Sequence, residues 1–122
     1  MTKRILVVED QVDNRQILRD LLASADYAIT EAENGEEALA AVAKQRPDLI
    51  LMDIQLPIMD GYEATRRIKA NPAWKDIPII VVTSYALSGD EAKARDAGCD
   101  AYVTKPYSPR LLLAKIREYM PK

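Results

Sequence analysis

The stretch Ile5-Leu6-Val7-Val8-Glu9-Asp10 joins four consecutive apolar residues to two acidic ones. An uninterrupted apolar run of this length is typical of a strand buried on both faces of a parallel sheet, because such a strand has no solvent side. The same arrangement returns at Leu49-Ile50-Leu51-Met52-Asp53. The sequence therefore predicts strands over residues 5–8 and 49–52, each followed directly by a carboxylate.

Three further runs extend this pattern to the whole chain. Residues 79–82 and 101–103 are again apolar, whereas residues 27–32 alternate, as is typical of an edge strand. The segments between the runs carry apolar residues at helical spacing, and they centre on residues 17–25, 38–43, 64–68, 92–97 and 112–120. Strict alternation predicts an α/β fold: a (βα)5 doubly wound, five-stranded parallel sheet of flavodoxin-like strand order 2-1-3-4-5, with helices on both faces.

The composition fits one domain that spans residues 1–122 and has no output domain. Hydrophobic residues make up 48% and charged residues 30%, an ordinary globular balance. The net charge is −2 and the basic residues form no stripe, which argues against direct binding of nucleic acid. No apolar run approaches the roughly 20 residues of a membrane span. No signal-peptide core follows Met1 either, so we expect a cytoplasmic protein.

Two residue types are scarce enough to exclude whole classes of chemistry. The chain has no histidine and a single cysteine, Cys99. Ser-His and Cys-His catalysis, histidine metal sites and an intrachain disulfide are therefore excluded.

Polar residues end four of the expected strands. In chain order these endings are Glu9-Asp10, Asp53, Thr83-Ser84 and Thr104-Lys105-Pro106. Ligands bind such sheets at the carboxyl ends of the strands, near the point where the strand order reverses. The first and third strands are neighbours there, so we expect the three carboxylates to meet, with Thr83 and Lys105 on the next two strands. Glu33 follows the edge strand and is expected to lie too far away.

Three carboxylates in one pocket repel one another unless a positively charged group or ion lies close to them. Lys105 supplies one charge, and a hard cation such as Mg²⁺ (or Mn²⁺) would supply the rest, since it suits one or two carboxylates, waters and a phosphate oxygen. An Asp in this setting can act as a nucleophile and form an aspartyl-phosphate. Mg²⁺ and Lys105 would neutralise the transferring phosphoryl group, and the Thr83 hydroxyl would bond one of its oxygens.

Four motifs, in this order, resemble the receiver domain of two-component response regulators over essentially the whole chain. They are Ile5-Leu6-Val7-Val8-Glu9-Asp10, Leu51-Met52-Asp53-Ile54-Gln55-Leu56-Pro57 followed by Met59-Asp60-Gly61, Val82-Thr83-Ser84, and Ala97-Gly98-Cys99-Asp100-Ala101-Tyr102-Val103-Thr104-Lys105-Pro106. Each motif alone is weak evidence, but all four at these spacings are highly specific. Asp53-Ile54-Gln55-Leu56-Pro57 and Gly89-Asp90-Glu91 are similar to single-domain receivers of the DivK type.

The resemblance implies a role for each residue of the acidic pocket. Asp53 would be the phosphoacceptor. The metal ligands would be Asp10, Asp53, the backbone carbonyl of Gln55 and, through a bound water, Glu9. Lys105 would bind the phosphoryl group, and the peptide bond between Lys105 and Pro106 would be cis.

Further matching positions would respond to the phosphoryl group. Thr83 and Tyr102 match a switch pair, in which the hydroxyl moves to the phosphoryl group and the aromatic ring rotates inward. Gln55, Ser84 and Tyr85 match positions that tune how fast water removes the group. From the residues alone, strand packing also explains Tyr102, and an ordinary surface aromatic also explains Tyr85.

The resemblance implies a switch rather than an enzyme, since the chain would catalyse only its own phosphorylation and dephosphorylation. The phosphodonor would be a sensor histidine kinase or a phosphotransfer protein. It would be recognised by exposed residues of the first helix, such as Asp13, Asn14, Arg15 and Leu18. The signal would pass to a downstream protein through the face formed by the fourth helix, the fifth strand and the fifth helix. The chain would be a monomer or a weak dimer.

Other functions use similar sheets. A phosphatase with an aspartyl nucleophile carries a second Asp two residues after the first, but Gln55 stands there and cannot transfer a proton. A nucleotide or flavin binder needs a Gly-rich first turn, whereas Glu9-Asp10-Gln11-Val12-Asp13 is acidic. A pseudo-receiver generally lacks an active-site residue, and none is missing here. A docking module with an unused acidic pocket remains an alternative.

Overall fold

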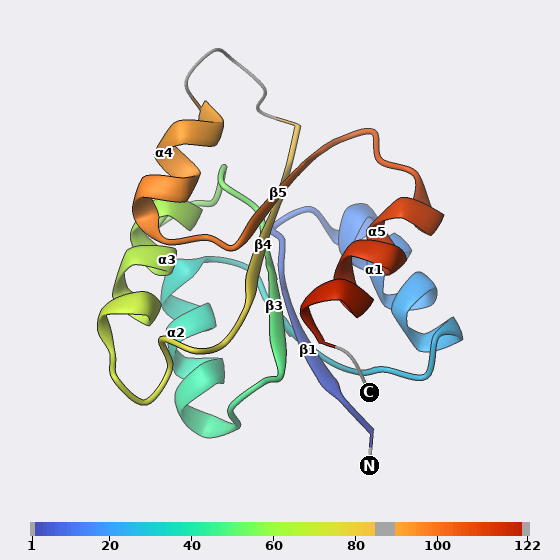
Figure 1. Cartoon of the computed structure of the whole chain (residues 1–122), viewed down its shortest axis with the longest axis horizontal. Coiled ribbons are helices and arrows are strands. Elements are labelled where there is room, and N and C mark those ends of the chain that lie inside the picture. Colours follow the sequence, from blue (N-terminus) through green and yellow to red (C-terminus); the bar gives the residue numbers. More distant parts are fainter. Residues whose placement is uncertain (1, 85–89, 121–122) are drawn as a thin grey trace.

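The computed structural model describes residues 2–84 and 90–120. Within them, strands and helices alternate strictly (Figure 1). The strands are β1 (Arg4–Val8), β2 (Ala28–Ala32), β3 (Leu49–Met52), β4 (Ile79–Thr83) and β5 (Ala101–Thr104). The helices are α1 (Val12–Ser24), α2 (Gly35–Lys44), α3 (Gly61–Ala70), α4 (Asp90–Ala97) and α5 (Pro109–Tyr119). Every expected strand is confirmed, with its bounds shifted by at most one residue.

The predicted sheet is confirmed as well. All strand pairs are parallel, and the order is β2-β1-β3-β4-β5. Helices α1 and α5 cover one face, and α2, α3 and α4 cover the other (Figure 1). The inner strands β1, β3 and β4 are buried almost throughout, whereas β2 and β5 form half-exposed edges. Because both faces are covered, the inner strands are apolar at nearly every position.

Residues at the helix ends explain where helices begin and stop. Ser108 accepts a hydrogen bond from the amide of Leu111 (3.4 Å), and Pro109 occupies the first turn of α5. Gly98 ends α4 with a φ of 107°, a conformation that favours glycine. Gly89, which the sequence places before α4, lies outside the described residues. None of the described helices has both the length and the apolarity of a membrane span.

The register of the inner strands determines where their last residues lie. The last residues of β1 and β3, Val8 and Met52, pair with each other. The amide of Asp53 then donates to the Val8 carbonyl at 3.0 Å. The last residues of β4 and β5 pair in the same way, and the amide of Lys105 donates to the Thr83 carbonyl at 2.8 Å. The polar residues that follow these strands therefore emerge together at the carboxyl ends of the strands.

One face of α1 differs from the expected apolar stripe. Leu18 and Leu22 are buried in the core, but Ile17 is 58% exposed and Ala25 is only half-buried. Ile17 does not lie over the sheet, because it lines a hollow between α1 and the segment that follows β5. The stripe that contacts the core is therefore narrower than the sequence suggests.

Candidate functional site

Three carboxylates meet at the carboxyl ends of β1 and β3. Glu9, Asp10 and Asp53 each bring one side-chain oxygen within 4.8 Å of the other two. Glu9 is 2% exposed and Asp53 is 8% exposed, whereas Asp10 is half-buried. The predicted meeting of these acids is confirmed. Glu33 is exposed and lies outside this cluster, as expected.

The carboxylate of Asp53 is held by the backbone that follows it. Its Oδ1 accepts hydrogen bonds from the amides of Ile54 (2.7 Å) and Gln55 (3.4 Å). Its Oδ2 lies 3.5 Å from Nζ of Lys105. The two oxygens are therefore unequal: one is bound to the backbone, and the other faces the ammonium group.

Lys105 contacts Glu9 more closely than it contacts Asp53. Its Nζ lies 2.6 Å from Oε1 of Glu9. Burial by itself would lower the pKa of Lys105, but the hydrogen bond to Glu9 and the charge of Asp53 outweigh it and raise that pKa above its ordinary value. The ammonium therefore stays charged at neutral pH. The peptide bond between Lys105 and Pro106 is cis, as the resemblance implies.

The donor atoms of the cluster suit a hard divalent cation, because all of them are oxygens. Both oxygens of Glu9 already have partners: Lys105 bonds Oε1, and the amide of Gln11 donates to Oε2 at 3.1 Å. Both oxygens of Asp53 also have partners, but its Oδ2 lies 3.5 Å from Lys105, against 2.6 Å for Oε1 of Glu9, so a cation would displace a weaker contact at Asp53 than at Glu9. One ammonium against three carboxylates also leaves negative charge that a cation would offset.

The predicted switch and tuning residues differ in how far their side chains are buried. Thr83 is fully buried at the end of β4. Tyr102 on β5 is half-buried and packs against the core beneath α2, α3 and α4. Ser84 and Gln55 are exposed, and Tyr85 lies outside the described residues. The roles of these residues remain predictions.

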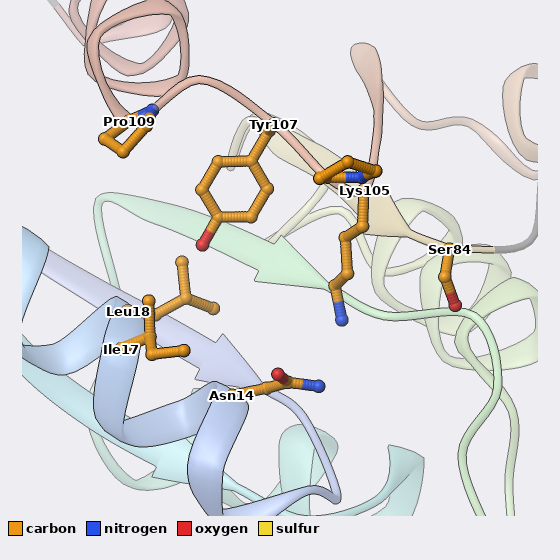
Figure 2. Close-up of a pocket in the computed structure, with 8 residues that line it drawn as sticks. Asn14, Ile17, Leu18, Ser84, Lys105, Tyr107 and Pro109 are labelled. Carbon is orange, nitrogen blue, oxygen red and sulfur yellow. The ribbon is translucent and has the colours of Figure 1, made fainter.

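A largely apolar hollow of about 420 Å³ opens beside Lys105 (Figure 2). Its lining comes from α1, from the end of β4 and from the segment after β5, and it comprises Asn14, Ile17, Leu18, Ser84, Lys105, Pro106, Tyr107 and Pro109. The hydroxyl of Tyr107 points across the hollow toward α1, and burial raises its pKa. The sequence pattern gives no signal for Tyr107, since its spacing resembles that of any surface aromatic.

Two of the α1 residues expected to be exposed to a partner are not. Leu18 is 3% exposed and belongs to the core. The side chain of Arg15 is 12% exposed, because it donates hydrogen bonds to Glu31 of β2 and to the backbone carbonyl of Glu9, in the loop after β1. Asp13 is exposed and Asn14 is half-buried. The expectation for Leu18 and Arg15 was therefore wrong in its premise of exposure.

Comparison with known proteins adds independent findings. The family model of the response regulator receiver domain matches residues 5–117. A polar-differentiation response regulator DivK from Brucella anthropi is 42% identical over 120 residues, which cover 98% of each chain. The crystal structure of a putative response regulator from Chloroflexus aurantiacus has a TM-score of 0.95 and 29% identity, with both chains covered completely. A receiver domain of a sensor histidine kinase from Pseudomonas aeruginosa, solved with a magnesium ion coordinated in the active site cleft, has a TM-score of 0.92 and 35% identity, again over both whole chains.

Proposed function

The chain belongs to the family of response regulator receiver domains, and from this premise we propose that it is a phosphoryl-accepting switch of a two-component phosphorelay. Asp53 is the acceptor, and the donor is a phosphohistidine on a sensor kinase or a phosphotransfer protein. The observation that carries the proposal is the meeting of three carboxylates with Lys105 at one edge of the sheet. A carboxylate nucleophile, a place for a hard cation and an ammonium group are the parts that such a transfer uses.

The unequal contacts of the two Asp53 oxygens support Oδ2 as the nucleophile. Oδ1 is bound to the Ile54 amide, so Oδ2 is the oxygen that attacks the phosphorus atom. A bond forms between Oδ2 and phosphorus, the bond between phosphorus and the donor nitrogen breaks, and its electron pair stays on the imidazole. Lys105 neutralises charge on the phosphoryl oxygens. Water later cleaves the acyl phosphate to carboxylate and phosphate, so the chain modifies only itself.

A divalent cation, Mg²⁺ or Mn²⁺, would share the charge of the phosphoryl oxygens in this pocket. The residues proposed to hold it are Asp10, Asp53, the backbone carbonyl of Gln55 and, through water, Glu9. The contacts of Glu9 with Lys105 and with the Gln11 amide support its indirect role, because a cation bound directly to Glu9 would have to displace the 2.6 Å contact with Lys105 or the bond to the amide. The magnesium ion in the Pseudomonas receiver domain supports a cation in the matching cleft of this chain.

Intact-mass measurement after incubation with acetyl phosphate tests the acceptor. Wild type is expected to gain a single phosphoryl group only when Mg²⁺ is present, and Asp53→Ala is expected to gain none, because it lacks the attacking oxygen. Asp20→Ala is the matched control, since Asp20 is an exposed acid on α1. Absence of any adduct on wild type would contradict the proposal and favour a docking module with an unused acidic pocket.

Thr83 and Tyr102 are proposed to transmit phosphorylation to the face formed by α4, β5 and α5, where a downstream protein would bind. Tyr102 lines a hollow of about 500 Å³ together with Leu111 and Lys115 of α5. On its other side it packs against the core. We propose that the ring moves between the core and the hollow, and that phosphorylation biases it toward one of these two positions.

The variant Tyr102→Ala is expected to accept the phosphoryl group normally but to lose this transmission. In wild type, phosphorylation should shift the backbone amide NMR signals of Leu111 and Lys115, and in the variant most of that shift should disappear. Tyr27→Ala is the control, because Tyr27 precedes the opposite edge strand and packs on the other face of the sheet. An undiminished shift in Tyr102→Ala would rule out the ring as the transmitting group.

A further inference from the structure

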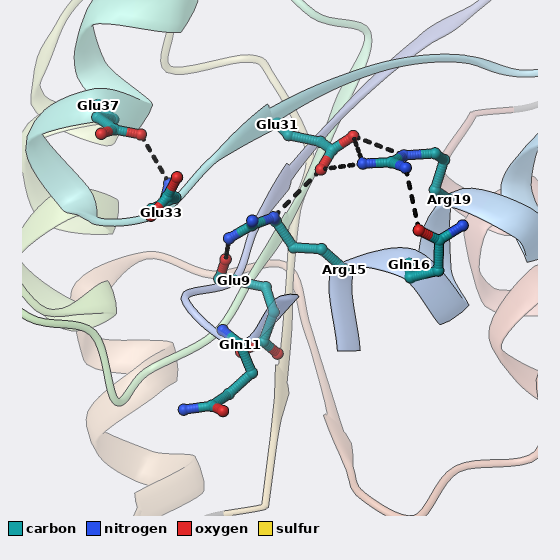
Figure 3. A network of polar contacts seen from close by, with 8 residues as sticks. All are labelled: Glu9, Gln11, Arg15, Gln16, Arg19, Glu31, Glu33 and Glu37. Carbon is teal, nitrogen blue, oxygen red and sulfur yellow. Dashed lines mark hydrogen bonds and ion pairs between the residues drawn. The ribbon is translucent and has the colours of Figure 1, made fainter. Parts of the chain in front are cut away.

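Arg15 connects the acidic loop after β1 to the edge strand β2 (Figure 3). Its Nη1 donates to the backbone carbonyl of Glu9 at 2.9 Å, and its Nε donates to Oε1 of Glu31 at 3.2 Å. Only 12% of the side chain is exposed. The guanidinium is therefore fixed between a strand and the loop that carries two of the three cluster acids.

The far end of this link is itself fixed. Arg19 donates to Glu31 from Nε at 2.8 Å and from Nη2 at 2.9 Å, so that the carboxylate is held from a second side. The loop is also attached to β2 directly, because the amide of Glu9 donates to the Ala32 carbonyl at 3.0 Å. The backbone of Glu9 is therefore held at two points: its amide is bound to β2, and its carbonyl is bound to Arg15.

The carbonyl that Arg15 holds belongs to the peptide group that leads into Asp10. A peptide group is planar, so the direction of the Glu9 carbonyl determines the direction in which the chain enters Asp10. Asp10 is half-buried within the acid cluster. Groups that orient metal ligands from behind strongly affect metal affinity.

We propose that Arg15 is a positioning residue of the cation site, which holds the Glu9–Asp10 peptide so that the Asp10 carboxylate points toward the divalent cation. This inference rests on the proposed function, in that the cluster is taken to bind Mg²⁺. Arg15 acts through the backbone and contacts neither the cation nor the phosphoryl group. It is distinct from Lys105, which contacts the carboxylates themselves.

The sign of the effect separates positioning from simple electrostatics. Arg15 carries a positive charge near a cation site, so its removal would strengthen Mg²⁺ binding if charge alone mattered. Loss of a positioning contact acts in the opposite direction, because Asp10 is no longer held toward the cation. Arg15→Lys separates the two causes further, since it keeps the charge but lacks the planar fork that reaches both Glu9 and Glu31.

The experiment is a Mg²⁺ titration of the whole chain, followed through its backbone amide NMR signals. Arg15→Met and Arg15→Lys are each expected to bind Mg²⁺ about tenfold more weakly than wild type. Arg19→Met is the matched control: its side chain is 45% exposed and bonds Glu31 but not the loop. Its Mg²⁺ affinity is expected to stay within about twofold of wild type, because an exposed charge is screened. The ¹⁵N shift of the Asp10 amide should change in both Arg15 variants, since it belongs to the peptide that Arg15 holds.

The outcomes test the positioning role of Arg15 and the existence of the cation site separately. Equal or tighter Mg²⁺ binding by Arg15→Lys would overturn the positioning role while leaving the cation site intact. If Arg15→Met does not fold, the charge-keeping Arg15→Lys still decides the question. Equal weakening in Arg19→Met, a variant that keeps the contact between Arg15 and the Glu9 carbonyl, would show that the weakening does not come from that contact and would overturn the inference. A wild-type chain that binds no Mg²⁺ would overturn the proposed function itself.

Discussion

Gly61→Ala is expected to lower the free energy of unfolding by about 3 kcal/mol and to impair phosphorylation at Asp53. A Cβ atom at position 61 would overlap the backbone carbonyl oxygen of Asp53 and would lie 2.9 Å from Cα of Ile54. These neighbours are backbone atoms, which cannot rotate away as a side chain would. Gly61 is also bound in place, because its amide donates to the Ile54 carbonyl at 2.9 Å. Either the start of α3 or the segment after β3 has to move.

The displaced segment is the one that orients the acceptor. The Ile54 amide donates to Oδ1 of Asp53, so a shift of this backbone turns the carboxylate away from Lys105. A loss of stability and a loss of acceptor activity are therefore expected together. Chemical denaturation measures the first, and phosphoryl incorporation from acetyl phosphate measures the second.

Gly98→Ala is the matched control for this substitution. Gly98 has a φ of 107°, and a Cβ there would meet the side chain of Lys69, at the end of the sheet remote from Asp53. We expect a cost of about 1 kcal/mol in stability and normal phosphorylation. A Gly61→Ala protein with wild-type stability and wild-type phosphorylation would show that the close approach at Asp53 is not required.

The parallel sheet could be predicted from the apolar pattern, and the acid cluster could be predicted once the flavodoxin-like strand order was assumed. A strand covered on both faces is apolar at every position, and this makes β1, β3 and β4 visible as uninterrupted runs. Once β1 and β3 are neighbours, the residues after Val8 and Met52 have to emerge together. The meeting of Glu9 with Asp53 follows from that register and from no detail of side-chain packing.

The contacts made by long side chains could not be predicted in the same way. Arg15 bonds Glu31, a residue of another strand, and spacing along the chain contains no information on such a pair. Lys105 was expected near the acid cluster as a whole, and spacing could not indicate that it lies 2.6 Å from Glu9 but 3.5 Å from Asp53. Ile17 fits the apolar stripe of α1 by period but lies over a hollow, because the neighbouring segment after β5 does not fill the space. Side-chain length and direction decide all three cases.

Asp53→Asn is expected to stabilise the protein in the absence of divalent cations, by about 1–2 kcal/mol. The amide keeps an oxygen that can accept the Ile54 hydrogen bond, so the local structure is preserved. The substitution removes repulsion from Glu9 and Asp10 and loses the attraction of one ammonium, that of Lys105. Two repulsions across at most 4.8 Å exceed one attraction across 3.5 Å, because the Coulomb energy varies only as the inverse of the distance, and the balance favours the neutral side chain.

Addition of Mg²⁺ is expected to reverse this order. Wild type gains stability with the logarithm of one plus the ratio of the Mg²⁺ concentration to the dissociation constant, which is about 2.7 kcal/mol at one hundred times the dissociation constant. Asp53→Asn gains less, because it offers the cation one negative charge fewer. Denaturation curves recorded with a chelator and with Mg²⁺ should therefore place the variant above wild type in the first condition and below it in the second.

Asp20→Asn makes the same change of charge at an exposed site on α1, outside the acid cluster, and serves as the control. Its stability should follow that of wild type in both conditions, since an exposed charge contributes little. A variant Asp53→Asn that is no more stable than wild type in chelator would mean that the three carboxylates are not crowded. A gain in chelator without reversal in Mg²⁺ would mean that crowding exists but that the cation does not bind at Asp53. The two conditions thus test the electrostatic premise and the metal site separately, on one pair of proteins.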